Sequence, residues 1–325
     1  MSSDHKHFLS MNVVANWQDR RLTSVLDAAH RRSRRRIMLL TIVAALMSGA
    51  GVFAYSSTFE AEHITGTFKV VAVATIISLL TATVLYPALK IQNQWLFQAT
   101  STMVYNNIDL LLVLGKLTEL RDGETASHNL RVTVYTVWIA EIIGFSPAEI
   151  VRAAKGALLH DVGKLVVPDH ILHKPGPLNP NERVEMNRHV QHGMDIISQS
   201  HSLLEAKPLV AAHHEHFDGT GYPFGLKAEA IPPEARLFAL VDVFDALTSA
   251  RVYKPAYSID DALATMSNGR GSHFDPVMFD HFKRLAPTIV AQMPKNEADL
   301  TQLLMDRLSP YLDDVAYLGP GLTDR

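Results

Sequence analysis

The sequence contains no cysteine among its 325 residues. This absence excludes disulfide bonds, thiolate zinc sites, thiolate-ligated iron–sulfur clusters and a cysteine nucleophile. Any metal ion must therefore be held by histidine, aspartate and glutamate. The chain also lacks a strong charge of either sign, since its net charge is −3. This argues against the electrostatic footprint of a protein that binds a nucleic acid polymer.

Charge is also absent from two long runs near the start of the chain. IMLLTIVAALMSGAGVFAY, residues 37–55, and VVAVATIISLLTATVLYPAL, residues 70–89, contain no charged residue. Each matches the roughly 20 residues that a helix needs to cross a bilayer. We therefore predict two transmembrane helices that form a membrane anchor over residues 37–90. The alternative is a pair of buried helices in a globular core.

The basic residues around these runs predict their orientation. The N-terminal segment, residues 1–36, contains eight Lys or Arg, whereas the connection SSTFEAEHITGTFK contains one Lys. The positive-inside rule then places both termini and the following domain in the cytoplasm, at a bacterial inner membrane. The connection is too short for a folded sensor domain, so the spans either tether the chain or also regulate it.

The remaining sequence has the pattern of an all-α protein. Residues 91–122 predict a connecting helix, which is either a plain connector or a surface that pairs with a second copy in a homodimer. The runs that follow show 3.6-residue periodicity and no alternating strands. Asn179 followed by Pro180 predicts a helix start. Residues 286–325 form a charged and less informative C-terminal tail.

Potential metal ligands are concentrated in the helical region. Six or more of them lie among Ala, Val, Leu and Ile, where an unpaired ionisable group is costly. A single histidine on an apolar helix is usually a satisfied core residue, but a set this large needs mutual partners. Nitrogen and oxygen donors suit iron, manganese, zinc or similar divalent ions. The candidates are Glu124, His128, His160, Asp161, His189, His213, His214 and Asp242.

Local spacing indicates how some of these side chains cooperate. His160 and Asp161 are consecutive, so on a helix they point about 100° apart. Asp161 can then bridge two ions while His160 holds one of them. Lys164 lies four residues after His160 on the same helix face, where its charge can meet a phosphate. Asp242 and Asp245 also share a face, so that one can bind a metal while the other orients a histidine or a water.

Several separate motifs together resemble the HD-GYP family, a branch of the HD phosphohydrolase superfamily. They are HD at 160–161, HHE at 213–215, DGTGYP at 218–223 and DVFDALTSARVYKPA at 242–256. The resemblance extends over residues 110–285 and implies an all-helical HD domain with two or three divalent ions. Of the ions that suit these donors, we expect iron or manganese. The resemblance further implies hydrolysis of the bacterial second messenger cyclic di-GMP to pGpG or GMP.

The resemblance also implies roles for individual residues. The positions that match ligands of a first ion are His128, His160, Asp161 and Asp242. Those that match ligands of a second ion are His189, His213 and His214. Asp161 matches the bridging carboxylate, Glu124 matches a ligand of a third ion, and His192 is not expected to be a ligand. The positions that match substrate contacts are Lys164, Tyr222, Arg251 and Lys254.

The DGTGYP segment predicts a tight loop that closes over the site. Its glycines permit backbone geometry that other residues resist, and Tyr222 offers a ring and a hydroxyl for a guanine base or a phosphate. A helix-terminating turn is an alternative role, and it is compatible with a site. We expect Glu215, Asp218 and Asp245 to support the ligands or the loop without binding a metal.

The expected mechanism is metal-assisted hydrolysis. Two cations make a bridging water acidic and clamp the phosphate oxygens. The resulting hydroxide attacks phosphorus in line with the departing ribose oxygen, while Lys164 and Arg251 offset charge on the phosphoryl oxygens. Asp161 and Lys164 are therefore the expected catalytic residues.

Two other functions stay open. One is a nucleotidase that acts on mononucleotides. The other is a non-catalytic receptor or scaffold that binds cyclic di-GMP or a partner such as a diguanylate cyclase. Intact ligand positions argue against the second alternative, and the GYP loop argues against the first.

Overall fold

The computed structural model describes residues 64–123, 127–250 and 255–318. The chain divides into two compact units, Met1–Thr102 and Met103–Arg325, which are described separately. The described part of the first unit belongs to one helix, α2 (Ile64–Asp122), whose last turns enter the second unit.

The predicted membrane anchor is not supported. Within the described residues, no helix is both long enough and apolar enough to cross a membrane. The second predicted span, residues 70–89, lies inside α2. Its lack of charge, on which the prediction rested, does not by itself establish a span. The first predicted span, residues 37–55, lies outside the described residues, and the predicted location stays a prediction.

The second unit is all-helical over its described residues, which confirms the predicted fold class. Its isolated bridge between Arg270 and Phe274 is the one β-type pairing there. The α-helices after α2 are α3 (His128–Ile143), α4 (Pro147–Leu159), α5 (Asp169–Leu172), α6 (Pro180–Asn187), α7 (His189–Ile197), α8 (Lys207–Ala212), α9 (Pro233–Thr248), α10 (Ile259–Ser267), α11 (Pro276–Ala291) and α12 (Glu297–Leu318). Short 3-10 helices are η2 (Val162–Val166), η3 (His201–Ala206) and η4 (Ala228–Ala230).

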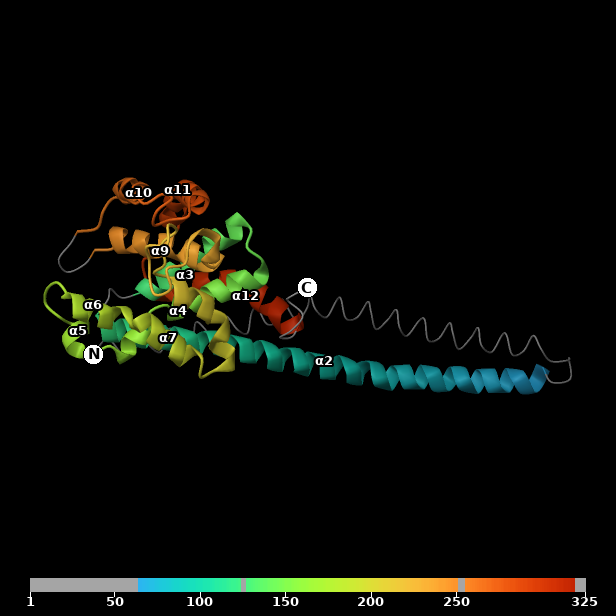
Figure 1. Ribbon diagram of the computed structural model, residues 1–325. Coiled ribbons are helices and arrows are strands. Elements are labelled where there is room, and N and C mark those ends of the chain that lie inside the picture. Colours follow the sequence, from blue (N-terminus) through green and yellow to red (C-terminus); the bar gives the residue numbers. More distant parts are fainter. Residues whose placement is uncertain (1–63, 124–126, 251–254, 319–325) are drawn as a thin grey trace, which may run out of the picture. The chain divides into compact units, whose positions relative to one another are not determined.

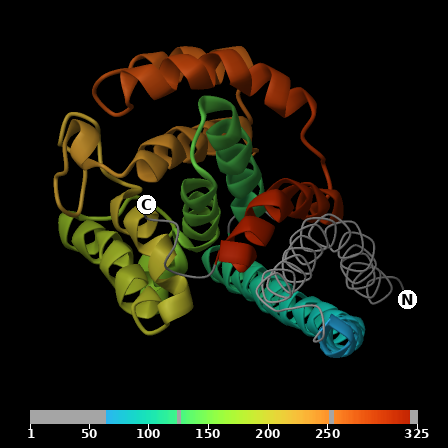
Figure 2. The ribbon, with the colours of Figure 1, turned by 90° about the vertical axis from the view of Figure 1, so that its right-hand side faces the viewer.

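The centre of this unit is formed by α3, which packs against α4, α9 and α12. Its apolar side chains, including Val132 and Ile139, are buried together with Phe238 and Phe244 of α9. On one side, α7 packs against η2 and α8. Figures 1 and 2 show α10 and α11 on the side of α9 that is away from α7. The central helices thus form a scaffold on which the chemistry-bearing residues are placed.

Local sequence explains where several helices begin. The predicted start at Asn179 and Pro180 is confirmed, because the Asn179 side chain accepts a hydrogen bond from the N–H of Glu182 at 2.9 Å in a capping box. Ser146 and Glu149 form the same motif before α4.

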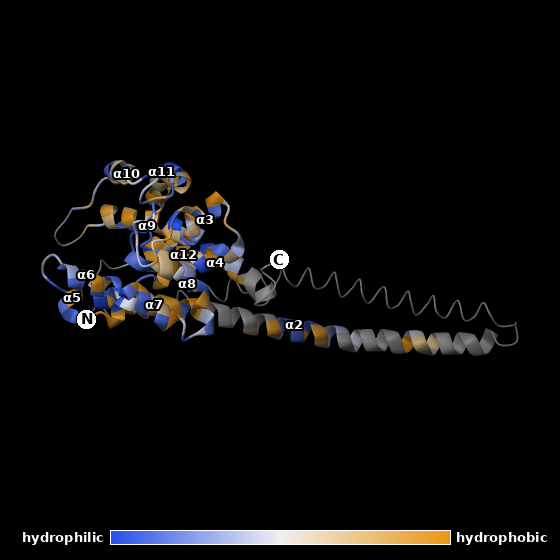
Figure 3. Cartoon of the chain, in the orientation of Figure 1, coloured by the Kyte–Doolittle hydropathy of each residue, from blue (hydrophilic) through white to orange (hydrophobic). Residues whose placement is uncertain are grey.

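Figure 3 shows hydrophobic and hydrophilic residues alternating along the helices, as expected for helices with one buried face.

Candidate metal centre

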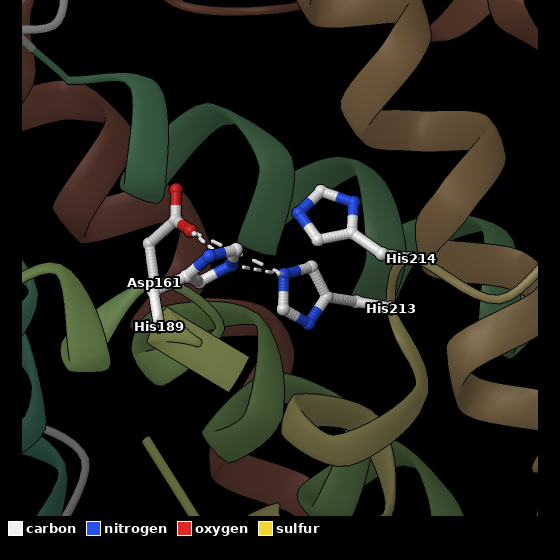
Figure 4. Close-up of side chains that lie close together, drawn as sticks. All are labelled: Asp161, His189, His213 and His214. Atoms are coloured by element: carbon white, nitrogen blue, oxygen red, sulfur yellow. Dashed lines mark hydrogen bonds and ion pairs between the residues drawn. The ribbon is translucent and has the colours of Figure 1, made fainter. Parts of the chain in front are cut away.

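The structure brings seven of the eight predicted ligands into two adjacent clusters. Within each cluster, one ligand atom from every residue lies within 4.8 Å of the others. The first cluster, drawn in Figure 4, contains Asp161, His189, His213 and His214. The second contains His128, His160 and Asp242. The eighth predicted ligand, Glu124, lies outside the described residues.

Nearly all of these side chains lie where a helix begins or ends. His128 and His189 are the first residues of α3 and α7, whereas His160 and His213 directly follow α4 and α8. Asp242 is different, because it lies within α9. The site is therefore formed where the ends of several helices meet the side of α9.

Asp161 lies between the two clusters. Its Oδ2 is 3.1 Å from Nε2 of His160 in the second cluster. Its Oδ1 is 3.4 Å from Nε2 of His189 and 4.0 Å from Nε2 of His213 in the first cluster. The two oxygens of one carboxylate thus face different groups of imidazoles, which is the arrangement that a bridging ligand requires.

Three of the imidazoles are oriented by the backbone. His160, His189 and His213 each place Nδ1 beside the carbonyl of the third residue before them, in the last turn of the preceding helix. These carbonyls belong to Ala157 at 2.9 Å, Met186 at 2.8 Å and Val210 at 2.9 Å. A carbonyl can only accept, so Nδ1 carries a proton and Nε2 is the nitrogen directed at the site.

This donor set fits a divalent metal ion. Nε2 of His189 and Nε2 of His213 are only 3.4 Å apart. Burial lowers the pKa of both imidazoles, well below the usual range for His213, so both are neutral at pH 7. Burial also lowers the pKa of His214 to about 3. Two converging lone pairs beside the carboxylate of Asp161 need a shared cation, and iron, manganese and zinc all accept such donors.

His128 is oriented by a side chain instead. Its Nδ1 is 2.8 Å from Oδ2 of Asp245, and its Nε2 is 3.6 Å from Oδ1 of Asp242. Arg131 donates to both oxygens of Asp245, at 2.8 and 2.9 Å. It also donates to the hydroxyl of Ser249 at 3.1 Å. The buried carboxylate of Asp245 thus connects an arginine to a candidate ligand, which matches its predicted supporting position.

The surroundings of Asp245 keep its carboxyl group ionised. Burial by itself raises the pKa of the carboxyl, but the hydrogen bonds and charges of His128 and Arg131 outweigh burial and lower the pKa to about 2. Sequence analysis did not identify Arg131. The available signal was its position three residues after His128, on the same face of α3.

Lys164 lies beside the bridging carboxylate. Its Nζ is 2.7 Å from Oδ2 of Asp161 and 2.6 Å from Oδ2 of Asp122, at the end of α2. Burial raises the pKa of Asp161, but the charges of Lys164 and His160 outweigh burial and hold the pKa well below its usual range. Asp122 is a second residue that sequence analysis missed.

Two further contacts fix the positions of helix ends that carry candidate ligands. The carboxylate of Glu119, on α2, accepts from the backbone N–H of Asn129 at 2.6 Å and thereby anchors the start of α3, where His128 lies. Gly163 follows Asp161 closely in η2, and a Cβ there would lie 1.8 Å from the carbonyl oxygen of His189. A glycine is therefore required for η2 to approach α7 and bring these two ligands together.

Glu215 holds the GYP loop. Its buried carboxylate accepts hydrogen bonds from the backbone N–H groups of Phe224 at 2.8 Å and Leu226 at 3.0 Å. A Cβ at Gly221 would lie 2.2 Å from the backbone nitrogen of His216. The glycine thus allows the loop to fold back against the HHE segment, and the carboxylate fixes it there.

The structure describes two of the remaining predicted residues, Tyr222 and Asp218. The ring of Tyr222 stacks on His214, with centroids 4.8 Å apart and planes inclined by 28°. Asp218 accepts from the N–H and hydroxyl of Thr220, so it shapes the turn. Arg251 and Lys254 lie outside the described residues.

The chain matches a known protein family and several named relatives. The profile of the HD domain family matches residues 83–278. The chain is 42% identical over 210 residues to a cyclic di-GMP phosphodiesterase of Vibrio cholerae, covering 60% of this chain and 43% of that protein. It is 43% identical over 173 residues to the cyclic di-GMP phosphodiesterase response regulator RpfG of Xanthomonas campestris, covering 53% of this chain and 46% of that protein.

A third relative has a different name. The chain is 36% identical over 185 residues to the 3'3'-cGAMP-specific phosphodiesterase 2 of Vibrio cholerae, covering 56% of this chain and 34% of that protein. The chain thus spans less than half the length of each of these three relatives.

Proposed function

Because the chain belongs to the HD domain family, we propose that it is a metal-dependent phosphodiesterase that hydrolyses a cyclic dinucleotide, with cyclic di-GMP as the substrate. One observation carries this proposal: the carboxylate of Asp161 lies between two clusters of metal-binding side chains, with one oxygen toward each. The names of the two relatives with the higher identity support cyclic di-GMP.

The residues of the two clusters would hold two divalent ions, with Asp161 shared between them. Iron or manganese is proposed as the metal, and the nitrogen and oxygen donors suit both. Bound ions of this kind supply an acidified water and neutralise charge on the phosphodiester. The backbone carbonyls and Asp245 keep the imidazole Nε2 atoms directed at the centre, so little side-chain ordering is needed when ions bind. A third ion near Glu124 stays a prediction.

Lys164 is proposed to stabilise charge on the phosphoryl oxygens. Its ammonium group is held between Asp122 and Asp161, so it lies beside the ion site before a substrate arrives. A preorganised cation of this kind stabilises charge that develops as the phosphorus–oxygen bond breaks. Lys164 is therefore already placed for catalysis, and its ammonium group is expected to contact a phosphate oxygen.

Tyr222 is proposed to contact the substrate through its hydroxyl. Burial raises the pKa of Tyr222, so the hydroxyl stays protonated and can donate to a phosphate or to a guanine edge. Its ring is fixed by stacking on His214. Arg251 and Lys254 are proposed as further contacts to the anionic substrate, on the basis of the motif alone.

The proposal is tested with the full chain, purified without oxygen and loaded with iron or manganese. It is incubated separately with cyclic di-GMP, 3'3'-cGAMP and a panel of mononucleotides, and the products are identified by mass spectrometry. We expect pGpG or GMP from cyclic di-GMP. Faster hydrolysis of 3'3'-cGAMP would assign the chain to the activity named for its third relative.

Two results would contradict a phosphodiesterase. Tight binding of cyclic di-GMP by metal-loaded protein without any product would indicate a receptor or scaffold. Hydrolysis of mononucleotides alone would indicate a nucleotidase. A diguanylate cyclase partner stays a prediction.

A further inference from the structure

The last turns of α2 carry apolar residues on two opposite faces. On one face, Ile108 and Leu111 are buried within the second unit. Two residues further along the chain from each, about 200° around the helix, Leu110 and Val113 are exposed. Leu117 and Leu120 continue the exposed face, whose four side chains are 49–70% exposed. One apolar face is thus covered by the chain itself, while the other is open.

The open face follows a heptad repeat. Leu110, Val113, Leu117 and Leu120 are separated by three, four and three residues, which is the spacing of a and d positions. The same register continues toward the start of α2. It places Leu89, Leu96 and Met103 at a positions, and Gln92, Ala99 and Asn106 at d positions.

Exposure supports this register in the last turns of α2, where Leu110, Val113, Leu117 and Leu120 are exposed while their neighbours Leu111 and Thr118 are buried. The a and d positions from Leu89 to Leu120 form a seam along α2. A seven-residue repeat kept over more than four heptads follows a left-handed supercoil. A partner helix that supercoils around α2 can therefore cover the whole seam. A globular surface would contact only part of it.

We propose that α2 forms a parallel, in-register two-stranded coiled coil with α2 of a second copy of this chain. Gln92, a polar and exposed d position, favours a second copy as the partner. In an in-register pair it lies in the same layer as the other Gln92, so each amide has an amide to hydrogen-bond with. An apolar partner helix or a lipid surface would leave this amide without a hydrogen-bond partner.

The flanks of the seam favour two strands. Lys116, at a g position, is 3.0 Å from the carboxylate of Glu297 in its own chain. Arg121, at an e position, is 2.6 Å from Asp169 and donates to the carbonyl of Val167 at 3.1 Å. These cations are already paired, so they do not repel each other strongly across a dimer. The flanks of larger assemblies take part in additional helix contacts, whereas here they are engaged by the chain's own domain.

The absence of cysteine allows a direct test of register. Leu110→Cys and Leu117→Cys are made separately in the full chain, which is then oxidised mildly. In a parallel, in-register pair each cysteine meets its own counterpart, so we expect both variants to form disulfide-linked dimers. Ile142→Cys and Val277→Cys are matched controls, because both residues are exposed but lie on α3 and α11. Equal cross-linking of the controls, or none at either seam position, would overturn the proposal.

The mass of the full chain provides a second, independent test. We expect sedimentation velocity to give the mass of two chains of 36.0 kDa. The double variant Leu110→Glu and Leu117→Glu should halve this mass, whereas Ile142→Glu with Val277→Glu should leave it unchanged. Circular dichroism checks that each variant keeps its helices.

Two outcomes of the mass measurement would contradict a dimer. A single-chain mass for the unchanged protein would overturn the proposal. The same mass accompanied by flotation on phosphatidylglycerol vesicles would assign the seam to a lipid surface instead. Both outcomes are independent of the phosphodiesterase assay, so failure here leaves the proposed function intact.

Discussion

The two clusters of the candidate metal centre are built by different means. In the first, His189 and His213 are oriented by main-chain carbonyls, which no side-chain substitution removes. In the second, His160 is oriented in the same way by the carbonyl of Ala157, but His128 is oriented by the carboxylate of Asp245, which in turn is held by Arg131. His128 is therefore the ligand whose orientation depends on a side-chain network, and a substitution in that network is expected to affect the second cluster alone.

The largest effect is expected from the residue that belongs to both clusters. Asp161→Ala removes the carboxylate that faces both groups of imidazoles, so we expect loss of metal from both clusters and turnover below detection. Metal content by mass spectrometry and product formation measure the two losses together. Asp218→Ala is the matched control, because this aspartate belongs to neither cluster and accepts hydrogen bonds from Thr220 in a turn. Full metal content with retained activity in Asp161→Ala would exclude the bridging role.

Asp245→Asn is expected to affect one cluster selectively. It replaces the charged acceptor of His128 and Arg131, so that His128 is no longer held in one tautomer and orientation. Changes of this kind typically cost 10–100-fold in metal affinity. We therefore expect one ion to dissociate about 10–100-fold more readily while the other is retained, as measured by metal titration. Asp195→Asn, at an exposed position of α7, serves as the control. Equal weakening of both ions would show that the clusters are not supported separately.

Lys164→Met is expected to leave both clusters loaded. The change removes a charge beside Asp161 without removing a ligand, so metal content should stay constant while kcat falls. The loss of a preorganised group that stabilises transition-state charge typically costs about 100- to 1000-fold. Steady-state kinetics and metal analysis on the same sample separate these effects. Loss of metal in parallel with activity would show that Lys164 supports the ligands instead.

The smallest effect is expected in the GYP loop. Glu215→Gln keeps one carbonyl oxygen where the carboxylate accepted from Phe224 and Leu226, so one buried N–H loses its acceptor. Such a loss costs about 1–3 kcal/mol. We expect a lower free energy of unfolding and a raised KM, with metal content unchanged. Glu229→Gln, at an exposed position in the same loop region, should change neither quantity.

The helical fold and the ligand set were accessible from sequence because their signals are local. Asn179 and Pro180 start a helix through contacts within three residues, and the HD and HHE motifs place ligands next to one another in the chain. Periodicity also identified the helices whose ends converge at the site. It could not show which ends meet, since that depends on packing such as the close approach at Gly163.

Residues that support the site from a distance were missed. Arg131 reaches Asp245 across 114 residues of sequence, and Lys164 reaches Asp122 across 42. No spacing rule connects such pairs, because tertiary packing brings them together. The span predicted at 70–89 is not supported, because no helix of the described residues is long and apolar enough to cross a membrane. The roles of Glu124, Arg251 and Lys254 stay predictions.

The central claim is that catalysis needs both clusters to be loaded. The most direct measurement is the rate of cyclic di-GMP hydrolysis by the metal-stripped full chain as Mn²⁺ or Fe²⁺ is added without oxygen. We expect no turnover without metal and a rise in rate that requires the second equivalent of metal per chain. A requirement for a third equivalent would support the role of Glu124. Full activity in the stripped protein, or after a single equivalent of metal, would show that hydrolysis does not need ions in both clusters.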